Sequence, residues 1–88
     1  MSPLIELLNF TKLQGVDAEV IELEVKEDSP ILENKLKDLN FPKEGIVGGL
    51  IRGDDSMIPR GDFEFKVGDR VLIVTKKEGM KAIEQMFK

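Results

Sequence analysis

Apolar and polar residues alternate in several short stretches of this chain, a pattern typical of β-strands. Val16 to Lys26 predicts a strand whose apolar face switches at Val20–Ile21, so we expect either a bulge there or partial burial of both faces. Ile46 to Arg52 predicts a second strand, in which Gly48-Gly49 indicates a bulge or the close approach of another backbone or a ligand. Arg70 to Thr75 is the most β-branched stretch and predicts a further strand.

Glycine and aspartate mark turns between the second and the last of these strands. Gly53-Asp54-Asp55 predicts a hairpin that leads into a short strand at Ser56–Ile58. Pro59 to Asp62 and Gly68-Asp69 predict two more turns, which flank the alternating stretch Phe63–Val67. This part of the chain therefore contributes a compact block of strands.

Apolar residues at helical spacing occur in three other stretches. Residues 2–12 predict a helix, with Ser2 as the N-cap and Pro3 at the first helical position. Residues 29–39 and 79–87 predict two more helices. Helices around one block of strands predict the α+β class, here a small mixed or antiparallel sheet of four to five strands with helices packed on it. We expect residues 1–15 to form an N-terminal helix and linker, and residues 16–88 to form one domain.

Composition limits the chemistry that this chain can perform. Its 88 residues fit a single small domain with a net charge of −4, and acidic and basic residues are interleaved, so we expect no nucleic-acid partner. Histidine and cysteine are absent, which excludes a histidine general base and any imidazole or thiolate metal site. No apolar run reaches the length of a membrane span, and we expect a cytoplasmic protein.

The string from Arg52 to Asp62 invites two chemical interpretations. Its Gly-Asp and Ser-Met elements are similar to those of serine–lysine self-cleaving peptidases, in which Ser56 would be the nucleophile. An extra Asp shifts the register, however, and Lys76 and Lys77 come too early to be the base. Clustered Asp residues also suit Ca²⁺ or Mg²⁺, but the calcium-loop spacing is absent, and Asp beside Gly is ordinary turn chemistry. We therefore expect neither an enzyme nor a metal site.

An ordered series of short blocks resembles the TrkA C-terminal domain, also called the RCK C-terminal domain. The blocks are Glu19-Val-Ile-Glu-Leu-Glu-Val25, Ser29-Pro-Ile-Leu with Leu36 and Leu39, Pro42, Ile51-Arg52-Gly53, Ile58-Pro59-x-Gly61-Asp62 and Gly68-Asp69-Arg70-Val-Leu-Ile-Val. Each block alone is common, but their order over Val16–Phe87 is specific. The chain departs from the family at Glu33, where members usually carry Gly.

The resemblance implies a cytosolic regulatory domain of a potassium or other cation transport system, peripheral to the membrane through a transporter or channel subunit. Family members pair as homodimers or larger rings and carry a Rossmann-type nucleotide-binding lobe, in the same or a separate chain. In some members cyclic di-AMP or another small ligand binds between two domains and biases the transporter. The alternative is a structural dimerisation module without a ligand, which Glu33 favours. This chain lacks a Gly-x-Gly-x-x-Gly motif, so we expect no cofactor within it.

In the family, the ligand groove is lined by the strand that corresponds to Ile46–Arg52. The resemblance implies apolar ligand contacts from Ile46 and Val47, and a phosphate contact from Arg52. A second interpretation stays open, in which Ile46 and Val47 belong to the core and Arg52 pairs with Asp54 or Asp55.

Overall fold

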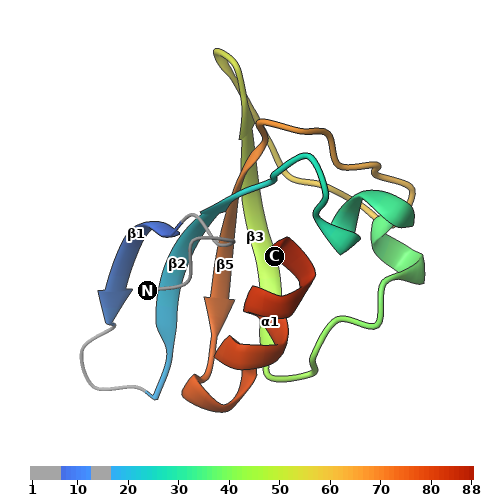
Figure 1. Ribbon diagram of the computed structural model, residues 1–88. Coiled ribbons are helices and arrows are strands. Elements are labelled where there is room, and N and C mark those ends of the chain that lie inside the picture. Colours follow the sequence, from blue (N-terminus) through green and yellow to red (C-terminus); the bar gives the residue numbers. More distant parts are fainter. Residues whose placement is uncertain (1–6, 13–16) are drawn as a thin grey trace.

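A computed structural model of the protein describes residues 7–12 and 17–88. A five-stranded antiparallel sheet forms its centre, with the strand order β1-β2-β5-β3-β4 (Figure 1). The strands are β1 (Leu7–Lys12), β2 (Glu19–Glu24), β3 (Gly45–Arg52), β4 (Asp55–Met57) and β5 (Arg70–Thr75). Three 3-10 turns, η1 (Pro30–Glu33), η2 (Leu36–Asp38) and η3 (Lys77–Gly79), and the helix α1 (Met80–Phe87) complete the fold. The expected α+β class is confirmed.

The core lies on one face of this sheet, under α1 and η1. In Figure 1, α1 crosses in front of β5 and β3. Ile83 and Phe87 of α1 are fully buried against the sheet. The other fully or nearly buried apolar residues come from β2, β3 and β5 and from the loops around them: Ile21, Leu23, Val25, Ile31, Leu50, Phe65, Val71 and Ile73. None of the helices in the described part of the chain is long and apolar enough to cross a membrane.

The predicted switch of apolar face in β2 is explained by burial on both sides. Ile21 and Leu23 are buried on the core face, and Glu22 between them is also almost buried. The pairing of β2 with β5 runs without interruption, so β2 has no bulge against this neighbour. β2 lies between β1 and β5, so it is an inner strand whose two edges are both paired with neighbouring strands.

Two helix predictions are wrong over described residues. Residues 7–12, expected to be helical, form β1 and pair with β2, while the start of the predicted helix lies outside the described residues. The predicted helix over residues 29–39 is replaced by η1 and η2, with an extended stretch between them. The amides of Leu36 and Lys37 donate to the carbonyls of Phe63 and Gly61, at 2.9 and 2.8 Å. Those bonds require an open backbone, which a continuous helix cannot supply.

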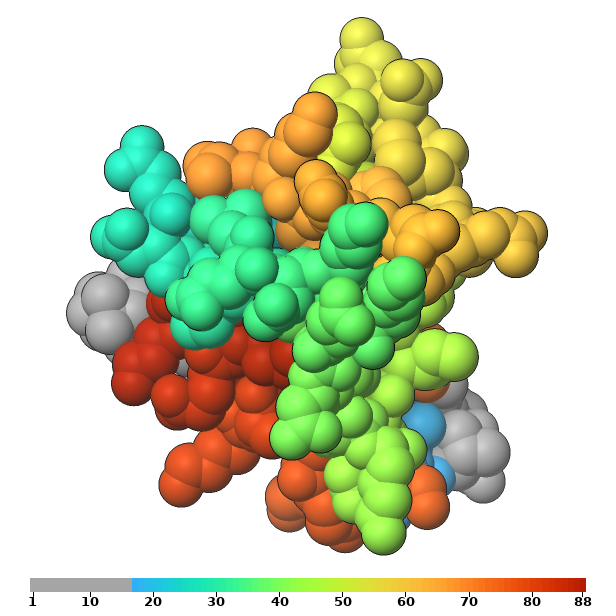
Figure 2. Space-filling model, turned by 90° about the vertical axis from the view of Figure 1, so that its right-hand side faces the viewer, coloured from blue at the N-terminus to red at the C-terminus, as the bar shows by residue number. Residues whose placement is uncertain are grey.

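The hairpin and the bulge in the strand block follow the sequence prediction. β3 pairs with β4 through a turn at Gly53-Asp54, and Gly53 has a φ of +60°, a conformation that favours glycine. The register of β3 against β5 shifts between Val47 and Gly49, which identifies Gly48 as the bulge. The tip of this hairpin extends beyond the rest of the molecule (Figures 1 and 2). The alternating stretch Phe63–Val67, in contrast, runs as a loop and not as a strand.

Candidate functional site

The three residues proposed as ligand contacts lie on β3 but do not converge. Val47 is opposite Ile73 on the core face and packs against the core. Ile46 is opposite Val74 on the other face of the sheet, and 64% of it is exposed. Successive residues of a strand point to opposite faces, so a ligand that lies flat on either face of the sheet contacts only one of these two side chains. Both residues do line a hollow beside the edge of β3. The interpretation of both as core residues therefore holds for Val47 and is wrong for Ile46.

Arg52 makes a bidentate ion pair with Asp69. The interpretation in which it pairs with Asp54 or Asp55 is therefore wrong. Its Nε and one terminal nitrogen donate to the two carboxylate oxygens of Asp69, both at 2.8 Å. Asp69 is 1% exposed and also accepts the backbone amide of Lys66 at 2.8 Å. These hydrogen bonds to Asp69 raise the pKa of the Arg52 guanidinium, against a smaller opposing effect of burial. The pair fastens the base of the β3–β4 hairpin to the turn before β5.

The rest of the Arg52 guanidinium is held by the loop between β4 and β5. The terminal nitrogen that binds Asp69 also donates to the carbonyl of Glu64 at 3.2 Å. The guanidinium carbon lies 4.9 Å from the ring centroid of Phe63, within the range of a cation–π contact. Arg52 is thus primarily a structural cation, and an anionic ligand would have to compete with a buried carboxylate for it.

The sheet face opposite the core is partly apolar and has no described helix on it. The strand register places five apolar residues on this face: Val20 of β2, Leu72 and Val74 of β5, and Ile46 and Ile51 of β3. Together with Ile58, which follows β4, they are called the open face. A hollow of about 530 Å³ lies on it, lined by Gly49, Leu50, Ile51, Ser56, Met57, Ile58 and Leu72. Ile58 is 75% exposed at its rim. A side chain at Gly49 would lie against Leu72 and fill part of this hollow.

Two smaller hollows flank Ile46. One of about 330 Å³ is lined by Leu36, Phe41, Gly45, Ile46, Val47, Pro59, Arg60 and Gly61. The other, of about 260 Å³, is lined by Ala18, Lys43, Glu44, Gly45, Ile46, Val74, Thr75 and Lys76. In Figure 2, the green residues around 36–41 run down the middle of the molecule, with α1 in red to their left and the segment after β4 above and to the right. The 330 Å³ hollow lies between this green segment, the start of β3 and the segment after β4.

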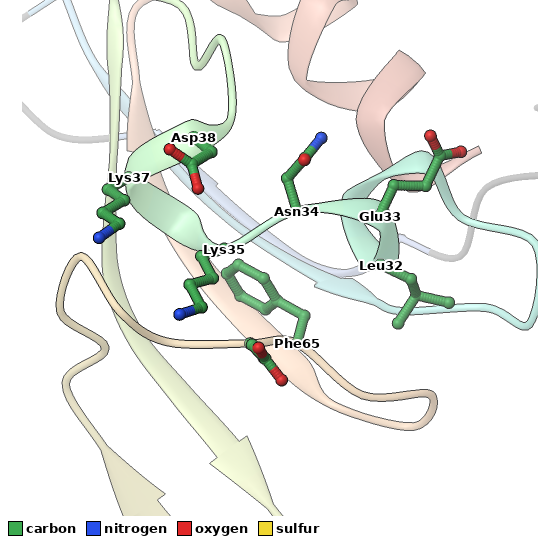
Figure 3. A pocket seen from close by; sticks show the side chains of 8 residues that line it. Leu32, Glu33, Asn34, Lys35, Lys37, Asp38 and Phe65 are labelled. Carbon is green, nitrogen blue, oxygen red and sulfur yellow. The ribbon is translucent and has the colours of Figure 1, made fainter.

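A further hollow of about 480 Å³ adjoins Glu33, where the family usually has Gly. It is lined by Leu32, Glu33, Asn34, Lys35, Lys37, Asp38, Glu64 and Phe65. Figure 3 shows Leu32 and Lys35 on the same side of the 32–38 stretch as Phe65, whereas Glu33, Asn34 and Asp38 point to the other side. Lys37 is paired with Asp62 at 3.1 Å. Side chains that diverge in this way do not enclose a compact ligand.

The structure separates the groups that serine–lysine catalysis would need. Ser56 is on β4, which pairs with the Arg52 end of β3, and Arg70 is opposite Ile51 at that end of β5. Lys76 and Lys77 follow the other end of β5. Over the described ranges, no three Asp or Glu residues gather in a way that would hold a metal ion.

The sequence of this chain is similar to those of known proteins. The sequence matches the TrkA-C domain family over residues 20–88. It is 37% identical over 90% of its length to "Trk system potassium uptake protein TrkA homolog 1" of Methanosarcina mazei. It is 30% identical over its whole length to "Trk system potassium uptake protein TrkA homolog" of Archaeoglobus fulgidus.

These alignments cover 18% and 20% of the two relatives, so the chain spans about a fifth of their length. A third relative, "Trk system potassium uptake protein TrkA" of Haemophilus influenzae, is 30% identical over 93% of the chain and 19% of its own length. The family match extends from β2 to the end of α1, and thus includes the buried core and the Arg52–Asp69 pair. The chain belongs to the TrkA-C domain family.

Proposed function

We propose that this chain is a regulatory domain of a potassium uptake system and does not itself catalyse a reaction. The observation that carries the proposal is its membership of the TrkA-C family together with relatives named as Trk system potassium uptake proteins. The absence of histidine and cysteine and the separation of Ser56 from Lys76 and Lys77 are consistent with a binding role. Its partners would be a membrane transporter or channel subunit and a Rossmann-type lobe, in the same or a separate chain. The domain would act at the cytoplasmic side of the membrane.

The open face supports pairing of two copies as a homodimer. It presents Ile46 and Ile58 to solvent beside partly buried Leu72 and Val74. A single domain of this size buries only about 60–65% of its unfolded surface, so a second copy would complete its burial. Exposed apolar residues on one face of a sheet favour a protein interaction site there.

A small regulatory ligand, such as cyclic di-AMP, is the finer part of the proposal. It would bind beside Ile46 at the dimer groove and favour one dimer geometry over another. The engagement of Arg52 with Asp69 argues for the alternative, a structural dimerisation module without a ligand. Arg52 reaches a phosphate only if the ligand replaces or extends the pair with Asp69.

Thermal unfolding of the chain with cyclic di-AMP, ATP, ADP, Mg²⁺ or K⁺ tests the ligand. A ligand present at a hundred times its Kd for the folded domain stabilises it by about 2.7 kcal/mol, which shifts Tm of a domain of this size by roughly 11–22 °C. A shift with cyclic di-AMP that is lost in Ile46→Glu supports the sensing role. No shift with any of these compounds favours the structural module.

Potassium uptake by cells tests the broader function. The gene for this chain is deleted from its host, and uptake is measured after the wild-type copy is returned. We expect reduced uptake, or a loss of its regulation, that the wild-type copy restores and an unfolded variant such as Ile73→Asp does not. Unchanged uptake in the deletion strain would contradict a role in potassium transport.

A further inference from the structure

The start of β3 has an outer edge that no described strand occupies. β4 pairs only with Leu50–Arg52, whereas β3 extends back to Gly45. The chain after β4 does not pair with this edge, and its buried Pro59, with Arg60 and Gly61, lines the 330 Å³ hollow together with the start of β3. Among the backbone hydrogen bonds that described loops make, none reaches Ile46–Gly49 on this side. Unpaired strand edges offer backbone groups to which an extended segment can bind.

Basic residues line both hollows beside Ile46, at the start of this edge. Arg60 lines the 330 Å³ hollow, and Lys43 and Lys76 line the 260 Å³ hollow on the other side of Ile46. No ion pair within residues 17–88 involves these cations, in contrast to Lys37, Arg52 and Arg70. Among the residues that line the two hollows, the one carboxylate is Glu44, in the 260 Å³ hollow, so the surroundings of Ile46 are basic in a chain whose net charge is −4.

We propose that the edge of β3 at Ile46–Gly49 binds an extended acidic segment of a partner protein. The backbone of the segment adds to the sheet, one apolar side chain enters the hollow beside Phe41 and Val47, and flanking carboxylates approach Arg60 on one side and Lys43 on the other. The two hollows are at or below the lower end of the volumes of small-molecule pockets, which suits single side chains. This edge borders the open face and shares Ile46 with it, and the proposal does not depend on potassium transport.

Peptide titration of the whole 88-residue chain tests this inference. The probe is a hexapeptide of alternating glutamate and valine, blocked at both ends, and the matched control has lysine in place of glutamate. We expect saturable shifts of the Ile46–Gly49 amides in ¹⁵N NMR spectra with the acidic peptide and none with the basic one. Because exposed charges carry the selectivity, binding of the acidic peptide weakens as salt is raised.

Charge reversal at Arg60 separates specific binding from general attraction. Arg60→Glu should weaken binding of the acidic peptide by at least about fivefold, since an attraction becomes a repulsion at an exposed site. Lys66→Glu, which makes the same change in net charge in the exposed turn before β5, should leave the affinity within about twofold. Circular dichroism verifies that both variants are folded.

Three results would overturn the inference. Equal binding of the two peptides would show that the edge does not select acidic segments. Shifts outside β3, or an unchanged affinity in Arg60→Glu, would place the peptide elsewhere. Hydrogen exchange of the Ile46–Gly49 amides without peptide gives the third result. If these amides exchange slowly in a dimer and quickly in the monomer, a second copy of the chain is the occupant of the edge.

Discussion

Asp69 is a carboxylate that is 1% exposed in a domain with few buried charges. Its two oxygens receive two nitrogens of Arg52 and one backbone amide, all at 2.8 Å. A buried charge of this kind is tolerated because its hydrogen bonds are satisfied, and removal of its cation leaves it uncompensated. The same contacts keep the β3–β4 hairpin fixed to the loop that precedes β5.

Substitution of Arg52 tests this structural role. Arg52→Ala should lower the free energy of unfolding by about 2–4 kcal/mol, because Asp69 stays buried without its partner. Arg52→Lys should recover only part of the loss, since a lysine cannot make the bidentate contact. Arg60→Ala is the matched control and should change stability by less than about 0.5 kcal/mol. Urea unfolding gives all three values, and equal stability of Arg52→Ala and Arg60→Ala would contradict the assignment.

Close packing of α1 on the sheet depends on glycines at its contact points. A Cβ added at Gly45 would lie 2.8 Å from Ile83 Cδ1 and 3.1 Å from the side chain of Thr75. At Gly48, in contrast, nothing is closer than 3.9 Å. Gly45→Ala should therefore destabilise the protein by about 1–3 kcal/mol through overpacking, and Gly48→Ala by much less. Thermal unfolding of the two variants checks the difference, and similar losses in both would argue against tight docking.

At the scale of elements, one hydroxyl connects the end of α1 to the turn before η1. Ser29 accepts the amide of Lys26 and donates to the carbonyl of Phe87, both at 2.8 Å, and is 2% exposed. Ser29→Ala should cost about 1–3 kcal/mol, because a helix carbonyl and an amide lose a buried partner. Hydrogen exchange of the α1 amides should accelerate more than that of β5. Uniform acceleration in both elements would indicate that Ser29 supports the whole core and not this junction.

The strands β2 to β5 and the last helix could be predicted because their signals are local. Alternation of apolar residues, Gly53 in the hairpin turn and Gly48 in the bulge each specify a conformation within a few residues. The first and second predicted helices failed for a different reason. Leu32, Leu36 and Leu39 have helical spacing, but the amide of Leu36 bonds to Phe63, which is remote in sequence. Tertiary pairing overrides helix propensity at such positions.

In the candidate site, too, local features could be predicted from the sequence and contacts between remote residues could not. Sequence proximity favours Asp54 or Asp55 as the partner of Arg52, whereas the structure places Asp69 there at a separation of 17 residues. The exposure of Ile46 depends on whether another layer covers its side of the sheet, which the strand pattern alone does not determine. Periodicity identified the strand, and only the fold assigned its two faces.

At the scale of the whole molecule, the two faces of the sheet are covered unequally by the described residues. One face of the sheet is covered by α1, η1 and the loop that contains Phe65, and the open face carries Ile46, Leu72 and Val74 without a described layer above them. Two-layer packing is the usual solution for a sheet with apolar residues on both faces. A second copy of the chain would supply the missing layer.

Two exposed apolar residues allow this to be tested with matched variants. Ile58 is 75% exposed at the rim of the hollow on the open face, and Val67 is 54% exposed in the loop before β5. We expect light scattering of the wild-type chain to give about twice its mass of 9.9 kDa at micromolar concentration. Ile58→Glu should weaken association by at least about tenfold, because a charge enters an apolar contact, and Val67→Glu should not. A monomeric wild-type chain, or equal effects of the two variants, would exclude a dimer formed through the open face.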